Sequence, residues 1–244
     1  MKRLLKQAHR YCYIFVVVFS FLLLYPLLYF YSRKEERFPV LNRLKGVFSF
    51  FTTAFAGIFF KYTRETEIDW SKPYVICPNH SSNLDIQAVS MFVKRNFAFM
   101  GKDDLLNNPV TGLFFRSVDI PVNRDSKISA FRAFKRAGEY LQKGYSVIIF
   151  PEGIIAEAYP PILQSFKNGA FRLAIEHKIA ILPVSITDVW KIMWDDGVKF
   201  GTKPGLGTVY IHPPIETKDL TLEDADLLRE QVYDKINSKL HAIK

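Results

Sequence analysis

A long apolar run near the start of the chain limits the folds that are open to it. The run extends from about Tyr11 to Tyr31 (YCYIFVVVFSFLLLYPLLYFY), and basic residues precede it at Lys2, Arg3, Lys6 and Arg10. About twenty apolar residues cross the hydrocarbon core of a bilayer, so this run predicts a membrane-attached helix. A secretory signal peptide fits less well, because the run is too long for a typical signal core and ends in bulky Tyr and Phe.

A second apolar segment, Val47 to Phe60, is shorter and is interrupted by Thr52, Thr53 and Gly57. At about fourteen residues it suits an interfacial or re-entrant helix better than a membrane span. The residues between the two segments include further cations, Arg33, Lys34, Arg37, Arg43 and Lys45. Because cations flank the first segment on both sides, the positive-inside rule assigns no orientation. We predict a two-helix hairpin that dips into one leaflet, with a kink at Pro26, and keep a single-span anchor as the alternative.

These segments divide the chain into N-terminal membrane-associated helices over residues 1–62 and a soluble domain over residues 63–244. The cysteines lie far apart in environment, with Cys12 in the apolar run and Cys77 in a predicted buried strand. No disulfide is expected between them, which favours a reducing compartment. We therefore expect the chain at the cytoplasmic membrane, with its soluble domain facing the cytoplasm.

The chain is strongly basic, with 33 Lys and Arg residues against 24 Asp and Glu residues and a formal net charge of +9. Such a balance suggests nucleic acid, an anionic lipid surface or a phosphorylated substrate as partner. No nucleic-acid module signature is present, so nucleic acid is not expected as a partner. Basic residues flank the apolar segments, where each contributes about 1 kcal/mol of attraction to anionic lipid. An anionic membrane surface is the expected partner.

From residue 70 onward, short apolar runs alternate with helical patterns. Strands are predicted over residues 74–77, 97–100, 119–122, 145–150, 180–186 and 209–212. Helices are predicted over residues 84–94, 126–143 and 167–177, and a capping box at Thr221 and Asp224 opens a last helix. Pro121 cannot donate to a strand ladder, which places its strand at an edge. The alternation predicts an α/β fold with a largely parallel central sheet flanked by helices.

The segment Asn79-His80-Ser81-Ser82-Asn83-Leu84-Asp85 lies between a predicted strand and a predicted helix. Its simplest interpretation is a helix start, in which Ser82 and Asp85 form a capping box. The same turn also brings Asp85 back beside the preceding loop, where it could accept a hydrogen bond from His80 Nδ1. Such a bond fixes the tautomer and leaves Nε2 as a base for a substrate hydroxyl.

Three more short motifs follow, each unremarkable when taken alone. They are Val122-Asn123-Arg124, Phe150-Pro151-Glu152-Gly153 and Phe166-Lys167-Asn168-Gly169, and Leu182-Pro183-Val184 comes after them. In this order, behind a His and an Asp separated by four residues, the set resembles the glycerolipid acyltransferase family. Within that family the chain is most similar to bacterial 1-acylglycerol-3-phosphate acyltransferases, over about residues 76–184.

The resemblance implies a glycerol-3-phosphate acyltransferase-like fold and a role for each matching residue. His80 would be the general base and Asp85 its orienting partner. Arg124 would bind the acceptor phosphate with help from Lys102, and Glu152 with Gly153 would shape the acceptor site. The acceptor would be a lysophospholipid in the membrane, and the acyl donor acyl-CoA or acyl-carrier protein. No cofactor is implied, and the scattered histidines give no metal-ligand spacing.

Two departures from the family pattern put the acceptor head group in question. Ile154 and Ile155 follow the FPEG motif where relatives commonly have Thr-Arg or Ser-Arg, and Ser117 lies near a position where relatives often have Gly. The proposed product is phosphatidic acid, but another lysolipid, such as a lyso-aminolipid or lyso-ornithine lipid, stays open as acceptor. A catalytically silent lipid-binding module is the second alternative. A serine hydrolase is set aside because no G-x-S-x-G elbow is present.

Overall fold

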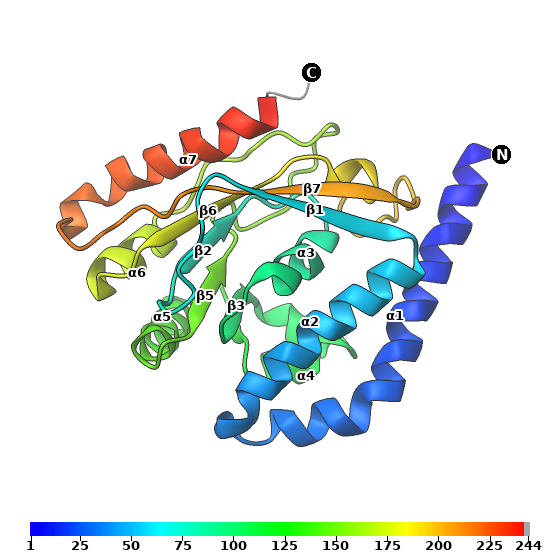
Figure 1. Ribbon diagram of the computed structural model, residues 1–244, viewed down its shortest axis with the longest axis horizontal. Helices are drawn as coiled ribbons and strands as arrows, with labels where there is room; N and C mark the ends of the chain where they lie inside the picture. Colours follow the sequence, from blue (N-terminus) through cyan, green and yellow to red (C-terminus); the bar gives the residue numbers. More distant parts are fainter. Residues whose placement is uncertain (242–244) are drawn as a thin grey trace.

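The protein is built around one seven-stranded sheet, and the computed structural model describes residues 1–241 (Figure 1). The strands lie in the order β1-β7-β6-β2-β5-β3-β4. Their bounds are β1 Ile58–Arg64, β2 Val75–Pro78, β3 Phe97–Lys102, β4 Ile120–Val122, β5 Ser146–Ile149, β6 Ile181–Ile186 and β7 Gly205–Ile211. Five strands, from β6 to β4, run parallel, whereas β7 runs antiparallel to β6 and pairs in parallel with β1. The predicted α/β fold with a largely parallel sheet is confirmed.

Helices cover both faces of this sheet. Their bounds are α1 Lys2–Ser32, α2 Phe38–Phe55, α3 Leu84–Phe92, α4 Thr111–Phe115, α5 Lys127–Gln142, α6 Gly169–His177 and α7 Ala225–His241. Alternate residues of β2 face opposite cores, since Val75 and Cys77 pack with residues of α5, α6 and α7 while Ile76 packs with residues of α3. Such a strand is buried on both faces, which explains its continuous apolar sequence.

Local sequence signals predict most of these elements well. Ser126 caps α5 by accepting from the Ser129 N–H, and Gly144 ends the region with a φ of +81° that favours glycine. The capping box of Thr221 and Asp224 is present before α7. Strand β4, which contains Pro121, lies at an edge of the sheet as predicted.

The second apolar segment, Val47 to Phe60, forms two elements, and the prediction of a single helix is wrong there. The helix ends at Phe55, a turn at Gly57 follows with a φ of +66°, and Ile58 begins β1. Strand β1 then pairs with β7 along its whole length. The predicted division of the chain between residues 62 and 63 therefore falls inside a strand of the central sheet.

Helices α1 and α2 form an antiparallel hairpin that packs on the domain (Figure 1). Phe21 of α1 contacts Phe48 of α2 edge to face, with 6.4 Å between ring centroids. A buried ion pair joins α2 to the segment before β4, since Lys45 Nζ lies 2.8 Å from both carboxylate oxygens of Asp119. The hairpin thus shares its packing with the sheet rather than standing apart from it.

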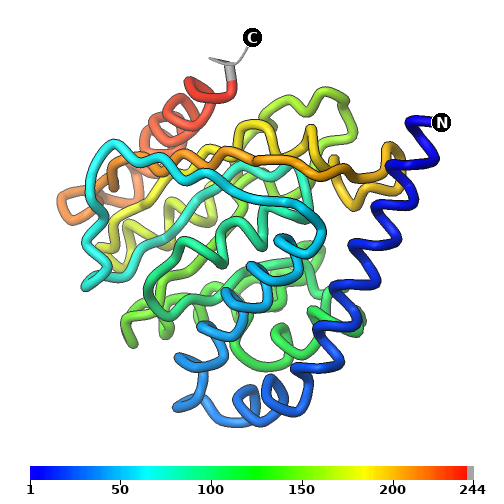
Figure 2. The backbone as a smooth tube through the Cα atoms, turned by 45° about the vertical axis from the view of Figure 1, so that its right-hand side comes forward, coloured from blue at the N-terminus to red at the C-terminus, as the bar shows by residue number. Residues whose placement is uncertain are grey.

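The N-terminal turns of α1 are also attached to the domain, at the loop that precedes β7 (Figures 1 and 2). The Thr202 N–H donates to Lys6 O at 3.0 Å, and Arg10 Nε donates to Asp196 O at 3.0 Å. His9 bonds Thr202 Oγ1 and also Ala56 O at 2.9 Å. Both ends of α1 are therefore held by the same body, since its other end leads through a short 3-10 turn, Glu35–Arg37, into α2.

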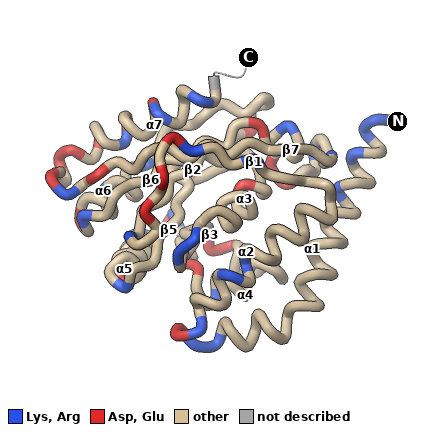
Figure 3. The backbone as a smooth tube through the Cα atoms, viewed as in Figure 1, with Lys and Arg blue, Asp and Glu red and all other residues tan. Residues whose placement is uncertain are grey.

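Beyond its basic N-terminal turns, α1 is apolar and mostly exposed, with only Phe21 and Leu28 buried. Figure 3 shows a long uncharged stretch between the basic N-terminal turns and the charged turn before α2. By length and composition, α1 alone among the described helices could cross a membrane, yet only 11% of its most apolar window is buried in the protein. That small fraction distinguishes it from the core helix of a soluble protein.

Candidate active site

The candidate residues meet because the strands that carry them are neighbours. His80 follows β2, Lys102 ends β3, Arg124 follows β4 and Glu152 follows β5. These four strands are parallel and adjacent in the sheet. In such sheets ligands bind beyond the carboxyl ends of the strands. The topology therefore brings motifs that are distant in the sequence together at the carboxyl ends of these strands.

His80 and Asp85 form a hydrogen-bonded pair across the first turn of α3. His80 Nδ1 lies 3.0 Å from Asp85 Oδ2, and the same oxygen accepts the Ser81 and Ser82 N–H groups at 2.7 and 2.8 Å. The predicted hydrogen bond between Asp85 and His80 is present, but the predicted capping box is not complete, because α3 has Asn83 as its N-cap and no side-chain cap. The Asp85 side chain is fully buried, whereas that of His80 is 15% exposed. With Nδ1 committed to Asp85, the Nε2 atom of His80 can act as a base.

Glu152 supports the backbone around His80. Its Oε1 accepts the His80 N–H at 2.7 Å, and its Oε2 accepts the Gln164 N–H at 2.8 Å. Burial raises the pKa of Glu152 from 4.5 to about 7, although both N–H groups favour the ionised form. The neighbouring Phe150 ring stacks on the His80 imidazole with 4.1 Å between centroids. Residues of the β5 loop therefore fix both the main chain and the ring plane of His80.

Two cationic side chains converge on Gly153. Arg124 donates to Gly153 O, and a Cβ built on Gly153 would lie 3.4 Å from Arg124 Nη1 and 3.3 Å from Lys167 Nζ. Gly153 has a φ of +77°, which a residue with a side chain adopts only under strain, and any side chain there would also displace the two cations. The glycine therefore lets the Arg124 and Lys167 side chains approach the same turn.

Lys167 is a member of this site to which the sequence analysis assigned no role. The FK-x-G motif contained the signal, but nothing in the sequence placed it against the FPEG turn. In the structure the Lys167 N–H donates to Pro151 O at 2.9 Å, which holds the two motifs together. Lys167 also supplies positive charge beside Gly153, the residue that precedes Ile154 and Ile155.

Lys102 is less closely involved than the sequence suggested. It is paired in register with Val122 on β4, two residues before Arg124, so it also lies at the carboxyl ends of the strands. Its side chain is 60% exposed, however, and forms an ion pair with Asp104. The Asp104 carboxylate raises the pKa of Lys102. Lys102 therefore contributes charge at the rim of the site, partly neutralised by its partner.

The loop between β6 and β7, which is distant in the sequence, borders the histidine motif. The Asp195 N–H donates to Ser81 O, and the Asn83 N–H donates to Asp195 O, both at 3.0 Å. The adjacent Trp194 is buried, and its Nε1–H has no acceptor among the residues that the structure describes. This loop also carries the contacts to α1, so backbone hydrogen bonds connect the membrane-like helix to the segment around His80.

Comparison with known proteins gives a matching family model and a solved structure of similar fold. The chain matches the family model described as Acyltransferase over residues 59–187. Among solved structures, the 1-acyl-sn-glycerophosphate acyltransferase of Thermotoga maritima is similar in fold, with a TM-score of 0.76 and 22% sequence identity. That match covers 99% of this chain and 95% of the other.

Several curated proteins are similar in sequence. An uncharacterized acyltransferase of Schizosaccharomyces pombe is 26% identical over 83% of this chain and 74% of its own length. A chloroplastic 1-acyl-sn-glycerol-3-phosphate acyltransferase of Arabidopsis thaliana is 32% identical over 67% of this chain and 44% of its own length. The corresponding protein of Saccharomyces cerevisiae is 29% identical over 70% and 57%. The chain thus spans about half the length of the relatives that carry this name.

Proposed function

The chain belongs to the acyltransferase family, whose model matches more than half of it, and we propose that it acylates 1-acylglycerol 3-phosphate. In this reaction a fatty acyl group moves from an acyl thioester to the sn-2 hydroxyl, and phosphatidic acid is formed. The names of the plant and yeast relatives support this choice of acceptor. The donor would be acyl-CoA or acyl-carrier protein.

One observation carries the proposal: the pair of His80 and Asp85 lies next to two cations that flank a glycine. Glu152 joins the two parts, since its carboxylate holds the His80 main chain and the next residue is Gly153. Arg124 and Lys167, which belong to different motifs, both approach Gly153. A base next to a phosphate site suits a substrate that carries its hydroxyl a few bonds from a phosphate.

The proposed chemistry needs only one base. His80 Nε2 removes the proton from the acceptor hydroxyl as its oxygen attacks the thioester carbonyl carbon. The tetrahedral intermediate then collapses, the carbon–sulfur bond breaks, and the thiolate leaves and takes the proton from the His80 imidazolium. Asp85 stabilises that imidazolium, and general base catalysis of this kind is worth about 10²–10⁴-fold in rate. Donors to the oxyanion would come from backbone N–H groups near the site.

The acceptor phosphate would sit over Gly153. There it would receive charge-assisted hydrogen bonds from Arg124, and Lys167 would act as a point charge. Lys102 would add long-range attraction from the rim. In this arrangement Lys167 takes over part of the role of the arginine that Ile154 and Ile155 replace, so the head-group site keeps two close cations.

Membrane attachment through the hairpin forms part of the proposal. Large apolar side chains are exposed along α1 and on one side of α2, namely Leu4, Leu5, Tyr11, Phe15, Phe19, Leu22, Leu23, Phe50, Phe51 and Phe55. A soluble protein rarely leaves such a surface in water. Because both ends of α1 return to the same domain, a hairpin immersed in one leaflet fits better than a helix that crosses both. We place the catalytic domain on the cytoplasmic side, where acyl thioesters are available.

The decisive experiment is acyl transfer by purified protein in detergent. Lysophosphatidic acid and neutral or zwitterionic lysolipids would be offered with each donor type, to wild type, His80→Ala and His177→Ala. His177 is a matched control, because it ends α6 outside the site. Phosphatidic acid formed by wild type and the control, and lost in His80→Ala, would support the proposal.

Two other results would change the assignment. If only a lysolipid without a free phosphate gave product, the alternative acceptor would be favoured. An uncharged head group would fit Ile154, which is exposed beside Gly153. No product from folded wild-type protein, with any acceptor or donor, would favour a lipid-binding module without catalytic activity.

A further inference from the structure

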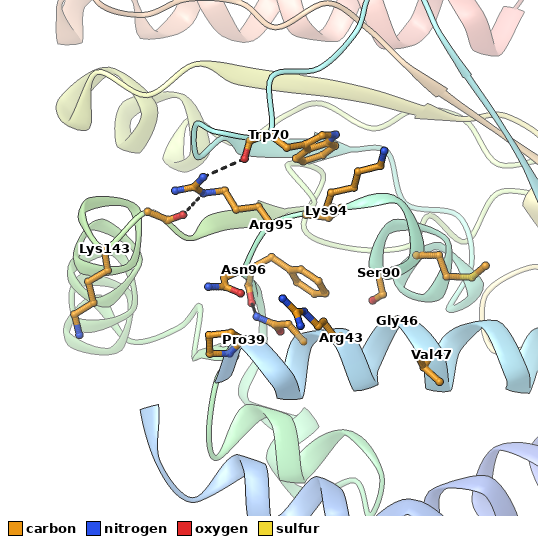
Figure 4. Close-up of a pocket in the computed structure, with 15 residues that line it drawn as sticks. Pro39, Arg43, Gly46, Val47, Trp70, Ser90, Lys94, Arg95, Asn96 and Lys143 are labelled. Carbon is orange, nitrogen blue, oxygen red and sulfur yellow. Dashed lines mark hydrogen bonds between the residues drawn. The ribbon is translucent and has the colours of Figure 1, made fainter. Parts of the chain in front are cut away.

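A cavity of about 600 Å³ lies at the amino ends of the strands, whereas His80 lies at their carboxyl ends. It opens between α2 and the amino ends of β3 and β5, and its lining includes Asn96 and Phe97 at the start of β3 and Gly144 before β5 (Figure 4). The candidate active site is at the carboxyl ends of the same strands. Since a strand rises about 3.3 Å per residue, the six residues of β3 separate the two places by roughly 20 Å. This cavity is therefore a separate feature.

The lining is basic and contains no acidic side chain. Its charged residues are Arg43 on α2, Lys94 and Arg95 after α3, and Lys143 after α5. Arg95 is held by backbone contacts, because it donates to Trp70 O at 3.0 Å and to Gly144 O (Figure 4). Lys143 pairs with Glu35. The side chains of Arg43 and Lys94 have no ion-pair or hydrogen-bond partner within residues 1–241. Two uncommitted cations therefore line a cavity of uniform positive sign.

A buried acceptor in the same lining also lacks a partner. Asn42 is 4% exposed, and its Nδ2 donates to Phe97 O at 2.9 Å. Its Oδ1 accepts no hydrogen bond from any residue that the structure describes. Buried polar groups without partners are rare and unfavourable. A hydroxyl group on a molecule bound in the cavity would supply the missing donor.

The cavity adjoins the apolar surface of α2. Val47, which lines the cavity, is 45% exposed and lies one turn after Arg43. Phe50, Phe51 and Phe55 continue the exposed apolar side of the helix. A molecule with an anionic head in the cavity could extend hydrocarbon chains along this side. Basic pockets beside membrane helices bind lipid head groups by the same physical means.

We propose that this cavity binds the head group of an anionic glycerophospholipid that carries a hydroxyl beside its phosphate. Arg43 and Lys94 contact the phosphate, the hydroxyl donates to Asn42 Oδ1, and the acyl chains follow α2 into the bilayer. The site holds the protein on anionic membrane independently of catalysis. Its test is therefore vesicle binding, and failure of the proposed acyl transfer would leave it unaffected.

The test compares vesicle binding of wild type with the double variant Arg43→Ala/Lys94→Ala at physiological salt. The vesicles contain phosphatidylcholine alone or with about one-fifth phosphatidylglycerol. The control variant Arg132→Ala/Lys135→Ala removes one Arg and one Lys from exposed positions on α5 that do not line the cavity. We expect the cavity variant to lose about 30-fold in affinity for the anionic vesicles, since each cation contributes roughly fivefold. The control should lose much less, and binding to phosphatidylcholine alone should not change.

A second comparison isolates Asn42. Phosphatidylmethanol has the charge of phosphatidylglycerol without its hydroxyls, so wild type should prefer phosphatidylglycerol by roughly fivefold, the value of one hydrogen bond. Asn42→Leu should abolish that preference. The ratio between the two lipids is the readout, because the variant also loses its bond to Phe97 O and could bind more weakly overall.

Several outcomes would overturn the assignment. Equal losses in the cavity and control variants would show attraction by net charge alone, and no loss in the cavity variant would remove the site. Equal binding of the two anionic lipids by wild type would remove the role of Asn42. Displacement from vesicles by millimolar glycerol 3-phosphate would assign the cavity to a soluble anion. Thermal unfolding and acyl transfer in detergent verify that each variant is folded.

Discussion

Asp85 Oδ2 lies 3.0 Å from His80 Nδ1 and also accepts the two backbone N–H groups that follow His80. One oxygen atom thus fixes both the imidazole and the turn that presents it. Because the aspartate is the second residue of α3, the orientation of the histidine depends on the position of that helix. The base is held by the fold rather than by a mobile loop.

Replacing Asp85 with asparagine should reduce turnover while leaving the fold intact. Asparagine can place its carbonyl oxygen where Oδ2 lies and keep the three hydrogen bonds, but it lacks the charge that stabilises the imidazolium. We expect kcat to fall by about 10²–10⁴-fold with little change in KM. Steady-state kinetics in detergent measure both constants. A variant that keeps more than roughly a tenth of wild-type kcat would rule out this role.

Removing either close cation should weaken binding of the acceptor. Arg124→Ala and Lys167→Ala should each raise KM for lysophosphatidic acid by about 10-fold or more, since hydrogen bonds to charged groups contribute roughly 1.5–3 kcal/mol. Lys102→Ala should have a smaller effect, because Asp104 already neutralises that residue in part. Arg132→Ala, on the exposed side of α5, is the charge-matched control. The reverse order, with Lys102 dominant, would move the phosphate site to the rim.

Glu152 should make the protein less stable as the pH rises. Burial raises its pKa from 4.5 to about 7, so between these values the native state keeps a proton that the unfolded chain releases. Glu152→Gln cannot ionise. Its free energy of unfolding should therefore rise relative to wild type, by up to about 3 kcal/mol, between about pH 4.5 and pH 7.

Urea denaturation across this pH range would measure the difference between Glu152→Gln and wild type. Glu157→Gln provides the control, because Glu157 is exposed and lies in the same loop. A difference between Glu152→Gln and wild type that does not vary with pH, or that grows toward acid, would contradict the raised pKa.

The buried pair of Lys45 and Asp119 should be a large contributor to the attachment of α2. The side chains are only 7% and 3% exposed, and the rings of Phe97, Phe99 and Phe114 surround the ammonium group. Lys45→Met leaves a buried carboxylate unpaired and should cost about 3–5 kcal/mol, part of which Asp119→Asn should restore. Lys72→Met, at the exposed pair with Asp69, should change stability by less than about 1 kcal/mol. Equal effects of the two lysine variants in urea denaturation would refute this ranking.

Gly201→Ala should detach the N-terminal turns of α1. Gly201 has a φ of +74°, and an added Cβ would lie 2.5 Å from the carbonyl carbon of Lys6. Hydrogen exchange at the Thr202 N–H, which donates to Lys6 O, should become faster, and turnover with vesicle-embedded substrate should fall. Gly144→Ala introduces similar backbone strain and is the control for hydrogen exchange only, because Gly144 lines the basic cavity. Unchanged protection of the Thr202 N–H in Gly201→Ala would disprove the contact.

The fold was largely predictable because its signals are local. Strand runs, helix caps and Pro121 each reflect the conformation of a few consecutive residues. Strand β1 was missed because Ile58, Phe59 and Phe60 continue the apolar run of α2, and periodicity cannot separate a buried strand from a helix over so few residues. Its strand character comes from pairing with β7, which lies far along the chain.

The candidate site was predictable to the extent that a residue belongs to a motif with a recognised role. Lys167 and the loop at Asp195 lie beside His80 or Gly153 only through tertiary contacts. No spacing in the sequence expresses those contacts. Conversely, no pattern along the chain indicates that Asp104 pairs with Lys102 and lowers its availability.

The attachment of both ends of α1 to one body has a mechanical consequence for the membrane. A hairpin confined to one monolayer displaces lipid there and adds no area to the opposing monolayer. The resulting mismatch of area is relieved by bending, so bound protein would act as a wedge and would accumulate where the lipids are loosely packed, as interfacial helices do. Phosphatidic acid made at such a place would enter the membrane where its packing is already under tension.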